Sequence, residues 1–178
     1  MDVNNFQRVG SVSNAHVGRD FESVAKEYFR QQGTSLGSNY SVPVGVSSEK
    51  KNRQFDLGSG EPAILVECKS HRWTTGGNVP SAKITVWNEA MYYFHLAPRH
   101  FRKVLFVLRD FSEKRGETLA AYYARNYGHL VPPGVEILEY DEVRREVKSV
   151  LATVSTKRVG TDVSYLDIEA PEREEDAA

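Results

Sequence analysis

The chain has a single cysteine, Cys68, among its 178 residues. One thiol excludes an internal disulfide framework and a zinc centre built on several thiolates. No uninterrupted apolar run approaches the roughly 18 residues that a transmembrane helix needs, and the first ten residues lack the apolar core of a secretory signal. We therefore expect a cytoplasmic protein with no membrane partner.

The sequence also lacks a large net charge. It has 23 Lys and Arg residues against 24 Asp and Glu residues, for a formal net charge of −1. This balance argues against a strongly basic protein that coats nucleic acid. The charge is uneven, because residues 169–178 hold five acids and one base and are typical of a solvated acidic tail. Residues 1–168 hold 22 basic and 19 acidic residues, a net charge of about +3, so a local contact with nucleic acid stays open.

Enough apolar residues are present for a folded core: 40% of the chain is hydrophobic and 11% is aromatic. The length predicts one domain over residues 1–152, followed by a C-terminal extension over residues 153–178 that ends in the acidic tail.

Hydrophobic periodicity and turn residues predict four helices and five strands in this domain. The expected helices cover residues 18–32, 81–95, 118–127 and 141–151, and Ser81 and Asp141 are the expected N-caps of the second and fourth. The expected strands cover residues 40–46, 53–57, 62–69, 103–109 and 135–140. The order α-β-β-β-α-β-α-β-α predicts an α/β fold with a mixed sheet flanked by helices.

Charged residues gather where the third expected strand leaves the core. Glu67 and Lys69 follow the apolar run at residues 63–66, and their i, i+2 spacing places both side chains on one face. A tight connection would pair this strand with the preceding one and bring Asp56 beside Glu67. Two carboxylates are suitable ligands for Mg²⁺, and Lys69 could then position or deprotonate a water molecule. A salt-bridged strand end is the alternative interpretation.

These motif halves, Phe55-Asp56-Leu57 and residues 64–69, resemble the PD-(D/E)XK, or restriction-endonuclease-like, nuclease superfamily. The superfamily has an α-β-β-β-α-β core, which the expected element order matches, although Phe55 replaces its proline. The resemblance implies that Asp56, Glu67 and the backbone carbonyl of Cys68 bind Mg²⁺, with Mn²⁺ as an alternative ion. It also implies that Lys69 handles the attacking water and that Glu22, on the first helix, orients Lys69 or ligates a second ion through water. An exposed helix residue is the alternative for Glu22.

Further residues are candidates for binding DNA. Basic side chains flank the motif in the sequence, and a loop that follows a catalytic strand often carries recognition. The nucleic-acid-binding candidates are Lys51, Arg53, His71, Arg72, Trp73, Asn88 and Tyr92. Trp73 could stack on a base or cover the core as a lid. Asn88 and Tyr92 resemble a Gln-x-x-x-Tyr element of some superfamily members, and packing is the alternative role for Tyr92.

The resemblance leads to the hypothesis of a Mg²⁺-dependent endonuclease that cleaves DNA in bacterial defence or DNA repair. Three alternatives stay open: a catalytically inactive nucleic-acid-binding or assembly subunit of the same fold, a nuclease that acts on RNA, and an α/β interaction protein. A homodimer is the hypothesis for its assembly, with residues 153–168 as an arm.

Overall fold

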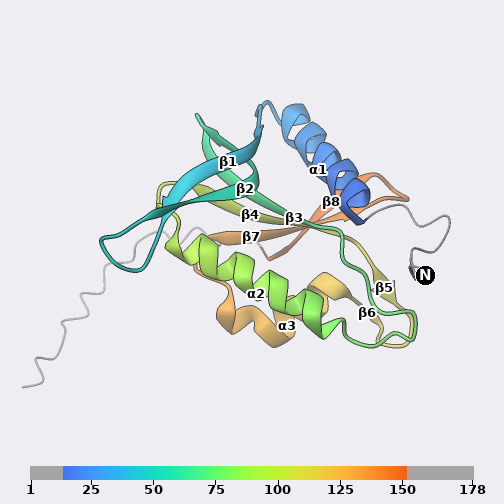
Figure 1. The fold of residues 1–178 in the computed structure, drawn as a ribbon. Coiled ribbons are helices and arrows are strands. Elements are labelled where there is room, and N and C mark those ends of the chain that lie inside the picture. The colour runs from blue at the N-terminus through green and yellow to red at the C-terminus, as the bar shows by residue number, and fades with distance from the viewer. Residues whose placement is uncertain (1–13, 152–178) are drawn as a thin grey trace, which may run out of the picture.

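One six-stranded mixed sheet organises residues 14–151, the part of the chain that the computed structural model describes. Helix α1 (Asn14–Gln31) covers one face of the sheet, and α2 (Ser81–Leu96) and α3 (Leu119–Tyr127) cover the other (Figure 1). The expected α/β class, with a mixed sheet flanked by helices, is confirmed.

The strands follow the order β1-β2-β3-β4-β7-β8 across the sheet. The first three form an antiparallel meander: β1 (Gly37–Val44), β2 (Lys51–Gly60) and β3 (Ala63–Lys69). Strands β4 (Arg102–Leu108) and β7 (Val135–Asp141) run parallel to β3, and β8 (Glu146–Leu151) closes the other edge antiparallel. A small hairpin of β5 (Phe111–Ser112) and β6 (Glu117–Thr118) precedes α3, and a 3₁₀ turn (Gly128–Leu130) follows it. The carboxyl ends of β3, β4 and β7 therefore lie side by side at the same end of the strands.

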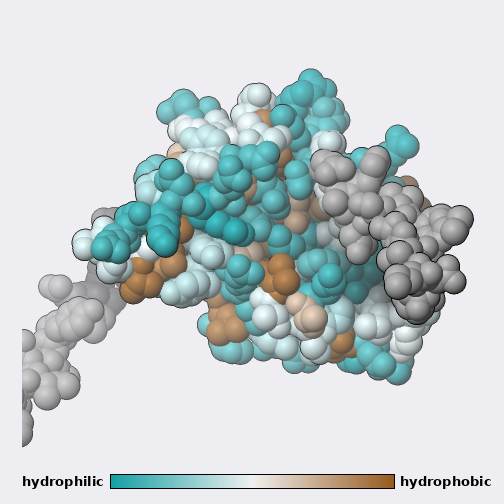
Figure 2. Space-filling view, viewed as in Figure 1, coloured by the Kyte–Doolittle hydropathy of each residue, from teal (hydrophilic) through white to brown (hydrophobic). Residues whose placement is uncertain are grey.

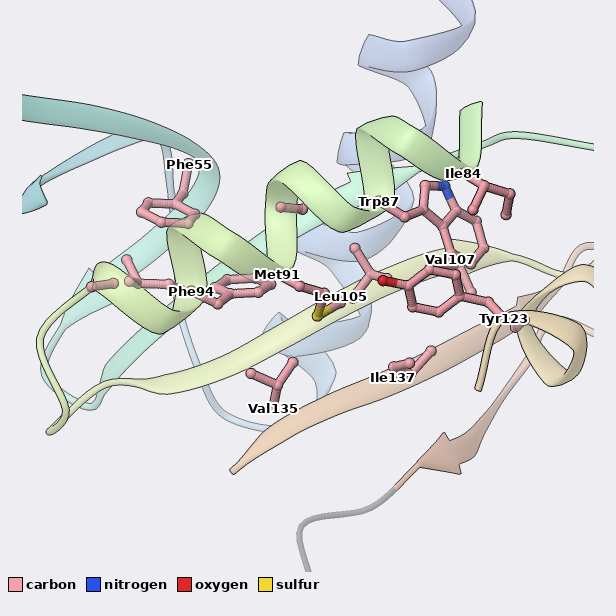
Figure 3. Packing of buried hydrophobic residues seen from close by; sticks show 14 of the residues in the cluster. Phe55, Ile84, Trp87, Met91, Phe94, Leu105, Val107, Tyr123, Val135 and Ile137 are labelled. Carbon is pink, nitrogen blue, oxygen red and sulfur yellow. The ribbon is translucent and has the colours of Figure 1, made fainter. Parts of the chain in front are cut away.

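Two hydrophobic cores lie on the two faces of this sheet. Under α1, the apolar positions spaced four apart, Phe21, Ala25 and Phe29, pack on β4. Under α2, the rings of Phe55 and Phe94 stack with centroids 5.4 Å apart. Figure 3 shows both side chains among the buried residues of this core. Strands β3 and β4 are buried on both faces, which agrees with their continuous apolar runs.

The expected helix over residues 141–151 is wrong, because these residues form a turn and the edge strand β8. The Asp141 carboxylate accepts hydrogen bonds from the backbone N–H groups of Val143 and Arg144, at 3.0 and 3.1 Å, as an N-cap would. Arg145 then adopts a left-handed φ of 56°, which reverses the chain instead of continuing a helix. The N-cap signal was real as a local hydrogen-bonding pattern and served a hairpin turn.

Two smaller expectations also change. Pro80 occupies the N-cap position of α2 without a side-chain cap, so the expected cap at Ser81 is wrong. The first strand ends at Val44, and Val46 is exposed in the loop that follows. The hypothesised dimer arm at residues 153–168 and the acidic tail lie outside the described residues.

The contact between β1 and β2 depends on Gly58. A Cβ atom at this position would lie 2.6 Å from the Tyr40 ring. We expect Gly58→Ala to lower the free energy of unfolding by about 1–3 kcal/mol through overpacking, measured by urea denaturation. Gly128→Ala is the matched control, because a Cβ there meets no atom within 4 Å. An equal effect of both substitutions would contradict this account.

No helix within residues 14–151 combines the length and hydrophobicity needed to cross a lipid bilayer. On the face shown in Figure 2, hydrophilic residues dominate and hydrophobic residues appear in separate small patches.

Candidate functional site

The β2–β3 hairpin brings the two acids of the motif together. Leu57 and Val66 are the last pair of the antiparallel register, and the next residues along the two strands are Asp56 and Glu67. The two side chains are close enough for the charge of Asp56 to act on Glu67. The Asp56 carboxylate accepts a hydrogen bond of 2.7 Å from the backbone N–H of Cys68. The expected tight hairpin is confirmed, and it fixes Asp56 across the gap where the two strands separate.

Glu67 is a buried carboxylate with incomplete pairing. Its side chain lies on the α2 face with Leu65, and only 4% of the residue is exposed. Lys69 Nζ donates to its Oε1 at 2.8 Å, and an Arg53 guanidinium nitrogen lies 3.5 Å from the same oxygen. Burial raises the pKa of Glu67, against the attraction of Lys69, and the charge of Asp56 raises it further. Its other oxygen, Oε2, is buried without a hydrogen-bond partner among the described residues.

A hollow of about 660 Å³ opens at the carboxyl end of β3. Residues from α1, β2, β3, the loop over residues 70–80 and the first turns of α2 line it. Its charged and titratable lining side chains are Glu22, Asp56, Lys69, His71, Arg72 and Lys83. Acids and bases therefore face one cavity, in which a cation and an anion could bind side by side.

Glu22 lies in this lining on α1, and its side chain is half-buried. The structure thus places it in the same hollow as Asp56 and Lys69. Cys68 lies between Glu67 and Lys69 and packs toward α1, on the opposite face, as expected for a small hydrophobe. Burial raises the pKa of its thiol, so the thiol is a poor nucleophile.

The donor set is compatible with Mg²⁺ but small. Within residues 14–151, no group of three or more His, Cys, Asp and Glu side chains is arranged to share a metal ion. Two carboxylates and a backbone carbonyl still suit Mg²⁺, which usually keeps several water ligands and binds through one or two carboxylates. The buried, unpaired Glu67 Oε2 next to Asp56 is an oxygen that such an ion would satisfy.

His71 is oriented by a buried tryptophan. The indole N–H of Trp87, which is fully buried on α2, donates to His71 Nδ1 at 2.9 Å. Burial, together with the smaller effects of the Lys83 and Lys69 charges, lowers the pKa of His71 to about 4. The imidazole is therefore neutral at pH 7, with its proton on Nε2.

The pH dependence of the free energy of unfolding tests the lowered pKa of His71. Because its folded pKa lies below the ordinary 6.5, the unfolded chain takes up the proton first as the pH falls. The contribution of the neutral His71 to the free energy of unfolding is therefore complete above about pH 6.5. It is lost as the pH falls toward about 4. We expect His71→Asn, which keeps an acceptor near the Nδ1 position, to lose about 1 kcal/mol less stability than the wild type between pH 7 and pH 4.5. This value is far below the full shift because the half-exposed ring is screened by solvent.

Urea unfolding at the two pH values measures this difference. Identical losses in the wild type and in the variant would contradict the assignment of a depressed pKa to His71.

Trp73 is anchored in the loop between β3 and α2. Its backbone N–H donates to an Asp110 carboxylate oxygen at 2.7 Å, and its indole N–H donates to the Asp110 carbonyl at 3.0 Å. Its ring meets Tyr122 edge-on at 5.4 Å, and the Arg115 guanidinium lies 5.0 Å from it. The side chain packs on the α2 core, which favours the lid interpretation, and stacking on a base stays a prediction.

The other DNA-binding candidates are dispersed. Arg72 lines the hollow but is paired with Asp110 and Glu142. The Arg53 guanidinium points inward to Glu67 and lies 4.3 Å from the centre of the Tyr93 ring. Lys51 begins β2, five residues before Asp56, and is not part of the hollow.

Asn88 and Tyr92 lie away from the carboxylates. They line a separate apolar hollow of about 380 Å³ between α2 and residues 129–133. Asn88 Oδ1 accepts a hydrogen bond of 3.0 Å from the Tyr123 hydroxyl, which connects α2 to α3. Tyr92 is about half exposed. The structure does not bring this pair to the motif residues.

Lys83 is a residue of the hollow that the sequence analysis missed. It lies in the first turn of α2, immediately before the buried Ile84. Its sequence signal is a basic residue beside the inward face of the helix that follows the motif strand. That signal is common on any helix, and only the fold brings Lys83 to the hollow.

No family model, curated protein or solved structure matches this chain.

Proposed function

We propose that this chain is a Mg²⁺-dependent deoxyribonuclease of the PD-(D/E)XK type, acting as a restriction- or repair-type endonuclease. One observation carries the proposal: Asp56 and Glu67 lie at the adjoining ends of β2 and β3, where Asp56, Lys69 and further basic side chains line one hollow and the buried Glu67 is hydrogen-bonded to Lys69. The element order α1-β1-β2-β3-α2-β4 supports it, because the superfamily core has the same order.

The proposed roles follow from the contacts. Asp56, Glu67 and the Cys68 carbonyl would hold Mg²⁺ or Mn²⁺, which when bound supplies charge neutralisation on the phosphodiester and a more acidic water. Lys69, fixed by its hydrogen bond to Glu67 Oε1, positions the attacking water. Glu22 lines the same hollow from α1 and would orient Lys69 or bind a second ion through water. Hydrolysis adds water across one P–O bond and leaves a phosphate monoester on one fragment and a hydroxyl on the other.

A cleavage assay on the full chain tests this proposal. Supercoiled, linear and single-stranded DNA and single-stranded RNA are incubated with the protein in Mg²⁺ or in Mn²⁺. We expect DNA cleavage that EDTA and the substitution Asp56→Asn both abolish. Glu146→Gln, an exposed acid on β8, is the matched control and retains activity.

Three outcomes contradict parts of the proposal. Equal cleavage by wild type and Asp56→Asn would mean that the activity does not belong to this site. Cleavage of RNA but not of DNA would mean that the substrate is RNA. DNA binding without cleavage would favour the inactive, nucleic-acid-binding alternative.

The cellular setting and assembly are part of the same proposal: a cytoplasmic protein of bacterial defence or DNA repair that acts as a homodimer. Cutting both strands of a duplex is the reason for two active sites. A monomeric mass by light scattering at micromolar concentration would contradict the dimer.

A further inference from the structure

One wall of the hollow has two side chains that the proposed cleavage centre does not use. His71 follows β3, and Lys83 lies in the first turn of α2. Neither hydrogen-bonds to Asp56 or Glu67 in the structure, whereas Lys69 is committed to Glu67. Lys83 is close enough to His71 for its charge to lower the pKa of the imidazole. The two side chains therefore form a separate pair with a positive charge and an uncharged ring.

The contact with Trp87 fixes which nitrogen of His71 can donate. Nδ1 accepts the indole N–H at 2.9 Å, so it carries no proton. The proton of the neutral ring then lies on Nε2, which is a donor only. The fully buried Trp87 occupies Nδ1, so Nε2 is the ring nitrogen left to donate to a group in the hollow that His71 lines.

The surroundings favour an anion at this wall. Lys83 supplies a full positive charge, and the nearby amino-terminal end of α2 adds the positive end of its helix dipole. The hollow, at about 660 Å³, has room for more than the group that reacts at Asp56 and Glu67. An N–H donor beside an ammonium group is suitable for a phosphate oxygen pair.

We propose that His71 and Lys83 form a second phosphate subsite, which binds the phosphate next to the cleaved one. Lys83 is its charged contact, and His71 is its uncharged hydrogen-bond donor through Nε2. This inference rests on the proposed function, since the neighbouring phosphate belongs to the same DNA strand. If it is correct, the second phosphate contact fixes the position of the DNA backbone relative to the cleavage centre.

The salt dependence of DNA binding separates the two roles. Each phosphate neutralised by a cation contributes about 0.9 to the slope of log K against log [salt] for duplex DNA. Binding of a labelled short duplex is measured by fluorescence anisotropy at pH 8, in EDTA and in Ca²⁺. We expect Lys83→Gln to weaken binding and to reduce the slope by about 0.9. His71→Asn is expected to weaken binding about 10-fold with an unchanged slope, because it removes a neutral donor.

Matched variants control for structural damage. His71→Asn keeps an acceptor for Trp87, whereas His71→Gln can place an amide N–H near the Nε2 position and should restore most of the affinity. Lys148→Gln, on the far edge strand β8, should leave the affinity nearly unchanged.

The inference is overturned if His71→Asn or Lys83→Gln binds like the wild type, if the wild type binds no DNA, or if His71→Asn reduces the slope as Lys83→Gln does. Failure of the proposed function is a different result. If these variants weaken binding as expected but the wild type cleaves nothing, the phosphate subsite stands on a non-catalytic DNA-binding protein. If the wild type cleaves DNA and both variants bind normally, the nuclease stands without this subsite.

Discussion

Lys69→Ala is expected to lower the single-turnover rate of DNA cleavage by about 10²- to 10⁴-fold, the range associated with losing a positioned group that handles a proton. The Lys69 ammonium lies 2.8 Å from Glu67 Oε1, and its side chain is only 12% exposed. Its position is therefore fixed before substrate arrives. We expect a much smaller change in DNA affinity, because other basic groups line the same hollow.

Lys69→Gln distinguishes catalysis from a structural salt bridge. The amide keeps an N–H donor for Glu67 but has no charge and does not act as an acid or a base near neutral pH. Low activity in both variants, with melting temperatures near that of the wild type, would support a role for Lys69 at the reacting water. Full activity of Lys69→Gln would contradict that role and favour the salt-bridged strand end. Lys148→Ala is the control for loss of an exposed lysine on β8.

Phe106→Ala is expected to lower the free energy of unfolding by about 3–5 kcal/mol, because it leaves a cavity between α1 and the sheet. Phe106 is fully buried on β4. Its ring centroid lies 5.5 Å from that of Phe21 and 6.4 Å from that of Phe29, both on α1. Urea denaturation measures the loss.

The exposed Val143 provides the comparison, since it is 94% exposed and Val143→Ala should change stability by less than about 0.5 kcal/mol. Phe106→Leu should lose less stability than Phe106→Ala, because it leaves a smaller cavity. A loss below about 1 kcal/mol in Phe106→Ala would contradict the packing of α1 on this strand.

The elements that the sequence predicted well are those with one dominant local signal. The apolar run at residues 63–66 can only be buried on both faces, and β3 lies between β2 and β4. Phe21, Ala25 and Phe29 share one helix face, and Gly33 follows the helix with a φ of +79°. The prediction of a helix after Asp141 was wrong because the signals in that segment fit both a capped helix and a hairpin turn. Pairing with the edge of β7 favoured the strand.

The candidate site was predictable in part, for a similar reason. The short connection between β2 and β3 determines that Asp56 and Glu67 meet, so sequence spacing sufficed. The positions of Lys83, Asn88 and Tyr92 depend on how α2 packs across the sheet. Spacing along α2 cannot reveal that Lys83 faces the hollow while Asn88 bonds to Tyr123 on α3.

The β2–β3 hairpin has a consequence for the order in which the site forms. Asp56 and Glu67 are eleven residues apart, so closing the loop between them costs little chain entropy. Glu22 and Lys83 reach the same hollow only after α1 and α2 dock on opposite faces of the sheet. During folding, the carboxylate pair should therefore form with the early local contacts, and the surrounding wall should form with the late, long-range ones. A substitution that loosens helix docking would open the hollow while leaving Asp56 and Glu67 on neighbouring strands.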